Sequence, residues 1–69
     1  MPFDYIFTFV DSYDGTNLDI FKIYSDSSEK IRICTVVGQD AARVYRLLAA
    51  FYSLQDRNAF IQEHFDKGN

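Results

Sequence analysis

Hydrophobic and polar residues alternate at the start of the chain, with the period of two that is typical of a β-strand. In residues 3–10 one face carries Phe3, Tyr5, Phe7 and Phe9, and the other carries Asp4, Ile6, Thr8 and Val10. Asp14-Gly15 then gives a hairpin signal. Further β-branched and aromatic runs predict strands at about 18–24 and 30–37. Because the connections are short, the sequence predicts a three-stranded antiparallel meander.

After Gly38 the apolar spacing changes to a helical period. From residue 40 onward the apolar residues gather on one arc: Ala41, Val44, Leu47, Leu48, Phe51 and Leu54. This pattern predicts a helix over about 39–52. Ser53 and Asp56 fit a capping box, which predicts a second helix over about 54–66 with Phe60, Ile61 and Phe65 turned inward. The predicted fold class is α+β, a single βββαα domain over residues 1–69 with both helices on one face of the sheet.

The strands are apolar on both faces, although a sheet covered by helices on one side should be polar on the other. Ile6 and Val10 occupy the second face of the first strand, and in the second strand Leu18 and Ile20 oppose Phe21 and Ile23. Asp4 and Asp19 share a face with part of this set. The sequence therefore predicts an apolar patch edged by acids, which serves either to bind a protein or to form a homodimer. Tyr45 and Tyr52 are further interface candidates.

Composition limits the function further. The chain has 69 residues, of which 17% are aromatic, so it is neither disordered nor large enough for a multidomain enzyme. The net charge of −3 combines six acidic groups and one basic group in residues 1–29 with six basic and four acidic groups in residues 30–69. The first half repels phosphates, whereas Arg43, Arg46 and Arg57 offer the second half a small basic face.

Residues with catalytic or metal-binding chemistry are few. Cys34 lies in an apolar strand, where burial raises the pKa of a thiol and lowers its reactivity. Cys34 and His64 could form a nucleophile–base pair, but no third group that would orient them accompanies it. The acidic loop that begins at Asp11 does not match the EF-hand template. When Gly15 is aligned with the template glycine, the first metal-ligand position falls on Val10, which has no side-chain oxygen. We therefore expect no enzymatic activity, metal or cofactor. One cysteine, no signal peptide and no apolar run of transmembrane length lead us to expect a cytoplasmic protein without membrane contact.

The second half of the chain resembles the KTSC domain, a short βββαα module of bacterial and phage proteins that also ends some lysyl-tRNA synthetases. The resemblance rests on the run Val44-Tyr45-Arg46-Leu47-Leu48-Ala49-Ala50, followed by Ser53, Phe60 and His64, and extends over roughly residues 11–66. The central Y-x-Y of the family is Ile31-Arg32-Ile33 here, and the proline that opens its first helix is missing. The resemblance implies RNA binding, an activity suggested for the family, through the arginine face.

The leading hypothesis is a non-enzymatic protein-binding domain. An acidic, aromatic-rich small product that begins at Met1 is typical of a phage or mobile-element inhibitor of host machinery, such as an anti-CRISPR. Its partner would present a basic surface, because carboxylates on a rigid sheet can occupy places meant for phosphates. The predicted binding residues are Asp4, Asp11, Tyr13, Asp14, Asp19, Phe21 and Asp26. The alternative is a KTSC-like RNA-binding accessory domain that uses Arg43, Arg46 and Arg57.

Overall fold

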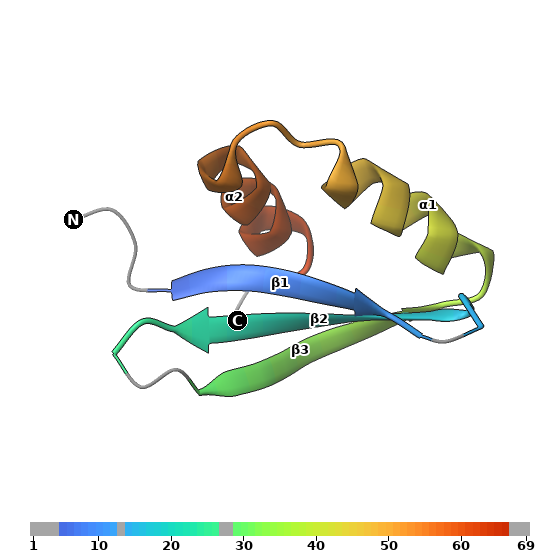
Figure 1. The fold of residues 1–69 in the computed structure, drawn as a ribbon, viewed down its shortest axis with the longest axis horizontal. Coiled ribbons are helices and arrows are strands. Elements are labelled where there is room, and N and C mark those ends of the chain that lie inside the picture. Colours follow the sequence, from blue (N-terminus) through green and yellow to red (C-terminus); the bar gives the residue numbers. More distant parts are fainter. Residues whose placement is uncertain (1–4, 13, 27–28, 67–69) are drawn as a thin grey trace.

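The protein folds as a three-stranded sheet followed by two helices. The computed structural model describes residues 5–12, 14–26 and 29–66. Its elements are β1 (Tyr5–Asp11), β2 (Asn17–Tyr24), β3 (Lys30–Val37), α1 (Gln39–Ala49) and α2 (Leu54–His64). The strands pair antiparallel in the order β1-β2-β3, and both helices lie on one face of the sheet (Figure 1). The predicted α+β class and βββαα order are confirmed. Phe3 and Asp4, at the start of the first predicted strand, lie outside the described residues.

The core lies between the helices and one face of the sheet. Every element except β3 contributes a fully buried apolar side chain: Phe7, Leu18, Ile20, Ala41, Leu48 and Ile61. Half-buried residues such as Cys34 and Val36 of β3 pack around this cluster. Removal of these apolar side chains from water is the main contribution that holds the helices on the sheet.

Strand register decides which residues face away from the core. Thr8 is paired with Phe21, and Ile6 is paired with Ile23. Because side chains alternate between faces and the buried Phe7 and Ile20 have the opposite parity, these four residues lie on the uncovered side. We call this side the outer face. Its described residues are Ile6, Thr8, Val10, Asn17, Asp19, Phe21, Ile23, Lys30, Arg32, Thr35 and Val37.

One irregularity interrupts the pairing of β2 with β3. Ile20 is paired with Cys34 and Phe21 with Arg32, so β3 holds an extra residue, Ile33, at this point. This is a β-bulge, which bends the strand and strengthens its twist. Ile33 is half-buried and packs against the core, so the bulge brings one more apolar side chain under the helices.

Two local signals in the sequence set where the helices begin. Gly38 has a φ of 70°, a conformation that residues with a Cβ rarely adopt, and its N–H donates to Thr16 O at 2.9 Å. The chain thereby turns from β3 into α1 beside the β1–β2 hairpin. Ser53 caps α2, because its Oγ accepts from the N–H groups of Gln55 and Asp56 at 3.1 and 3.3 Å.

The helices are shorter, and their buried stripes narrower, than the sequence predicts. α1 ends at Ala49 and α2 at His64. The prediction that Leu47 and Leu54 face the core is wrong, since they are 46% and 45% exposed. Adjacent helix residues point about 100° apart, and a small sheet contacts only a narrow stripe of α1. Leu48 occupies that stripe, so Leu47 is turned to the side.

Leu48 and Leu47 form a matched pair for testing this core. Truncating the buried Leu48 to Ala leaves a cavity, and we expect the free energy of unfolding to fall by about 2–5 kcal/mol. Leu47→Ala removes the same atoms from a half-exposed position, so its effect should stay under about 1 kcal/mol. Urea unfolding followed by circular dichroism measures both values. Equal losses for the two variants would contradict the orientation of α1.

Candidate functional site

The outer face is the side of the sheet that neither helix covers (Figure 1). Ile6, Phe21 and Ile23 form its half-buried apolar floor, and Val10 and Val37 are 48% and 61% exposed. A positive group adjoins this floor, because Lys30 Nζ lies 4.7 Å from the centroid of the Phe21 ring. Such a cation–π contact leaves the ring partly shielded while the ammonium group stays in water.

The charges on the outer face are more basic than the sequence suggested. The carboxylate of Asp19 accepts a hydrogen bond from Thr35 Oγ1 at 2.6 Å, and Arg32 Nη1 lies 4.0 Å from it. Asp19 is therefore already paired within the sheet. Lys30 and Arg32 outnumber it among the described residues of this face, so a charged partner group that meets the β3 side finds two cations.

The structure separates the residues predicted to bind a partner. Asp19 and Phe21 share the outer face. Asp11 ends β1 and Asp14 lies in the following turn, whereas Asp26 lies in the turn between β2 and β3, at the opposite end of the sheet (Figure 1). Asp4 and Tyr13 lie outside the described residues. The described acids thus form no continuous rim around the apolar floor.

Asp14 organises the β1–β2 turn. Its Oδ1 accepts from Thr16 Oγ1 at 2.8 Å, from Ser12 Oγ at 2.9 Å and from the Thr16 N–H at 3.2 Å. The side chain of Thr16 and then that of Ser12 are the main reasons why the pKa of Asp14 lies below its ordinary value of 3.8. These hydrogen bonds show that Ser12, Asp14 and Thr16 stabilise the conformation of the turn itself.

The three predicted RNA-binding arginines do not share one surface role. Arg43 is exposed, and its Nη1 lies 3.7 Å from Oδ1 of Asp40. Arg46 is exposed in the last turn of α1. Arg57 is half-buried: its Nη2 donates to Phe7 O at 2.7 Å, and its guanidinium lies 5.2 Å from the Phe9 ring centroid. Burial lowers the pKa of Arg57. Arg57 therefore ties α2 to β1.

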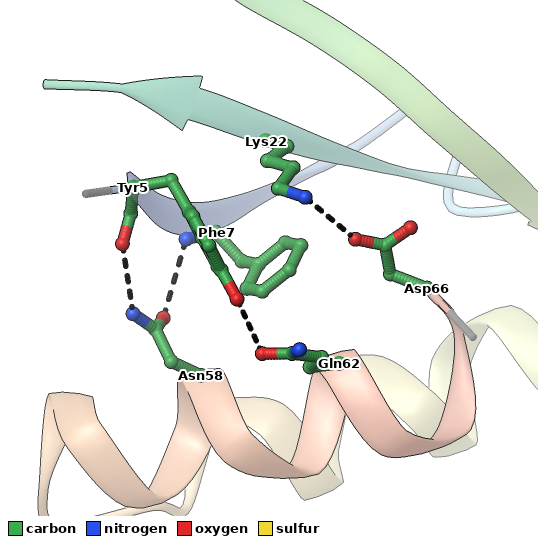
Figure 2. Close-up of polar contacts among 6 residues, drawn as sticks. All are labelled: Tyr5, Phe7, Lys22, Asn58, Gln62 and Asp66. Carbon is green, nitrogen blue, oxygen red and sulfur yellow. Dashed lines mark hydrogen bonds and ion pairs between the residues drawn. The ribbon is translucent and has the colours of Figure 1, made fainter. Parts of the chain in front are cut away.

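The neighbouring Asn58 makes the second tie and is missing from the sequence-based candidates. It is 4% exposed, accepts from the Phe7 N–H at 3.2 Å, and donates from Nδ2 to Tyr5 O at 3.5 Å (Figure 2). The Tyr5 hydroxyl in turn donates to Gln62 Oε1. A usable signal exists in the sequence, since Asn58 lies three residues before the buried Ile61, where helical spacing demands an inward side chain.

A largely buried ion pair, between Lys22 and Asp66, lies close to the contact of α2 with β1. Lys22 Nζ lies 3.0 Å from Asp66 Oδ2 and 4.3 Å from the centroid of the Tyr5 ring (Figure 2). Burial opposes the charge of Lys22, but the hydrogen bond and charge of Asp66, together with smaller contributions from Tyr24, outweigh it, so the pKa of Lys22 is raised. A shallow hollow nearby is lined by Ala59, Gln62, Glu63 and Asp66. Two of these residues already bond to β1 and β2.

Cys34 and His64, which the sequence analysis considered and set aside as a nucleophile–base pair, have different surroundings in the structure. Cys34 packs against the core, and burial is the main cause of its raised pKa, which keeps the thiol protonated. His64 is exposed and stacks on Phe60 with ring centroids 4.3 Å apart. Within the described ranges, no three His, Cys, Asp or Glu side chains are grouped so that they could hold a metal ion.

Comparisons with known proteins were made against family models, curated proteins and solved structures, and nothing matches this chain. The KTSC resemblance stays a prediction. In the part of the chain that the structure describes, no helix is long and apolar enough to cross a membrane.

Asn58→Leu tests the tie between α2 and β1. This substitution leaves the Phe7 N–H and the Tyr5 carbonyl without their partner, so the free energy of unfolding should fall by about 1–3 kcal/mol. In addition, the Phe7 amide proton should exchange faster with solvent. Gln55→Leu, at an exposed position of the same helix, is the control and should change stability by less than about 0.5 kcal/mol. An unchanged exchange rate at Phe7 would count against the bond.

The hydrogen bonds of the β1–β2 turn predict that the contribution of Asp14 to folding stability depends on pH. Because its folded-state pKa is lowered, ionised Asp14 stabilises the fold above pH 3.8, and this stabilisation is lost as the pH falls through the folded-state pKa. In an NMR titration its carboxyl should have a midpoint below 3.8. Thr16→Val removes the strongest donor and should move the midpoint upward. A midpoint at 3.8 or above in the wild type would refute the turn geometry.

Proposed function

We propose that this chain is a non-enzymatic binding domain that docks another protein on the outer face of its sheet. One observation carries the proposal: Ile6, Phe21 and Ile23 line a sheet face that neither helix covers, while a complete core exists on the other side. When a partner removes apolar side chains on such a face from water, the free energy of the complex is lowered.

The charges beside this floor favour a partner with carboxylates. Asp19 is held by Thr35 and Arg32, so the charge of Lys30 is the positive charge on the β3 side that Asp19 does not offset. A partner that places an apolar side chain over Phe21 and acidic groups near β3 matches both features. A sheet of three strands is roughly 14 Å wide, which suits one helix of about 10 Å diameter lying along it.

The inhibitor hypothesis is a finer version of the same proposal. A phage or mobile-element inhibitor of host machinery, such as an anti-CRISPR, would use this surface, with Asp11 and Asp14 at the hairpin end available to a basic region of the target. RNA binding through Arg43 and Arg46 is the competing hypothesis. The two differ in which substitutions abolish binding.

Capture experiments with matched variants test the proposal. The tagged protein is exposed to extract from the organism that encodes it, beside Ile23→Asp and Arg32→Glu on the outer face and Arg46→Glu on α1. We expect a captured protein that is lost with both outer-face variants and retained with Arg46→Glu, because only the first two alter the docking surface. Circular dichroism verifies that each variant is folded.

Other outcomes decide against the proposal. A captured protein that binds all three variants as well as the wild type would place the interface elsewhere. An RNA whose binding is lost with Arg46→Glu and falls steeply with salt would favour the competing hypothesis.

A further inference from the structure

The two edges of the sheet differ in how their backbone groups are satisfied. At the β1 edge, α2 takes up the N–H and carbonyl of Phe7 and the carbonyl of Tyr5 through Arg57 and Asn58. At the β3 edge, no side chain of α1 or α2, both fully described, hydrogen-bonds to the strand backbone. An edge with free N–H and carbonyl groups is a template for an added strand.

The register shows which groups of β3 point outward. In an antiparallel pair, successive residues direct both backbone groups alternately toward and away from the partner strand. Phe7 points away from β2, so its partner Lys22 points toward β3. The bonds from Tyr24 N to Glu29 O and from Gly38 N to Thr16 O follow the same alternation. The outward groups of β3 are therefore those of Lys30, Arg32, Thr35 and Val37.

The bulge at Ile33 limits which strands can pair in register along the β3 edge. Two residues, Ile33 and Cys34, separate the outward-pointing Arg32 from the outward-pointing Thr35, where a regular strand has one. A regular strand that pairs on one side of the bulge is out of register on the other side. A second copy of this chain carries the same bulge, so an antiparallel β3–β3 pair centred on it keeps register on both sides.

Charge complementarity favours the same pairing. In that register Arg32 lies opposite Thr35 of the second copy, and Lys30 lies opposite its Val37, so no two cations face each other directly. Thr35 holds the carboxylate of Asp19 at 2.6 Å on the outer face. Arg32 of one copy thus comes within side-chain reach of Asp19 of the other.

We propose that two copies of this chain pair along β3, antiparallel and centred on the bulge, to form a six-stranded sheet. The pair uses the β3 edge of both copies, so the same mode of pairing cannot continue and the assembly is a closed dimer. At the β1 edge, α2 already bonds to the backbone of Tyr5 and Phe7. The proposal concerns a strand edge and does not depend on the docking function of the outer face. It places the outer faces of both copies side by side on one surface.

Sedimentation equilibrium tests the dimer and its location. We expect a concentration-dependent dimer whose Kd rises roughly tenfold or more in Val37→Pro, which removes an outward N–H from each copy and leaves the β2 pairing intact. Val37→Thr is the control, because it keeps the N–H, and its Kd should stay close to that of the wild type. A chain that remains monomeric up to the millimolar range overturns the proposal, as does a dimer insensitive to Val37→Pro.

Cross-linking tests the register if Val37→Pro does not fold. In a Cys34→Ala background, Arg32→Cys combined with Thr35→Cys places the new thiols opposite each other across the pair, with Cα atoms about 5.5 Å apart. Oxidation should give a covalent dimer. Lys30→Cys combined with Thr35→Cys is out of register and should cross-link far less. Equal cross-linking of the two combinations, or none in the first, rejects the β3–β3 pairing.

Discussion

The attachment of α2 to the edge of β1 determines how the rest of this small protein is arranged. Apolar contact between Ile61 and the core holds the helix on the sheet, but the hydrophobic effect has no direction and does not fix where the helix sits. Asn58 and Arg57 supply the direction, since their polar groups must meet particular backbone atoms of Tyr5 and Phe7. A shift of one residue would leave buried donors and acceptors unpaired, at a cost of about 1–3 kcal/mol for each group.

This attachment also decides which surfaces remain available. α2 packs over β1, and α1 packs over β2, β3 and part of β1, so both helices lie on one face of the sheet. α2 also bonds to the backbone at the β1 edge. The uncovered surfaces are the outer face and the edge of β3. Lys30 and Arg32 belong to both of them, because their side chains lie on the outer face and their backbone groups point outward. A substitution at either residue therefore acts on two surfaces. The same holds for Val37, so the comparison of Val37→Pro with Val37→Thr is what separates loss of the edge N–H from a change of the side chain.

The sequence predicts the elements well because they depend on local patterns. The period-two alternation of residues 5–10, the turn at Asp14-Gly15 and the Ser53 cap each act through neighbouring residues, and all appear in the structure. Arg57 and the bulge at Ile33 depend on contacts between segments distant in sequence. A charged helix residue is usually solvated, so nothing local marks Arg57 as an internal ligand of a strand. The turn acids show the reverse case, because Asp14 was predicted as a partner-binding residue from its charge, and the sequence did not reveal that its carboxylate also bonds within its own turn.

On the outer face of a sheet that is apolar on both sides, the apolar side chains partly shield one another from water. Ile6, Phe21 and Ile23 are each only partly exposed, because side chains of adjacent strands cover one another. The ammonium group of Lys30 lies over the Phe21 ring, 4.7 Å from its centroid, and covers part of it. A partner that draws the ammonium aside with a carboxylate would uncover the ring, which couples the charge of the partner to the apolar contact that it makes.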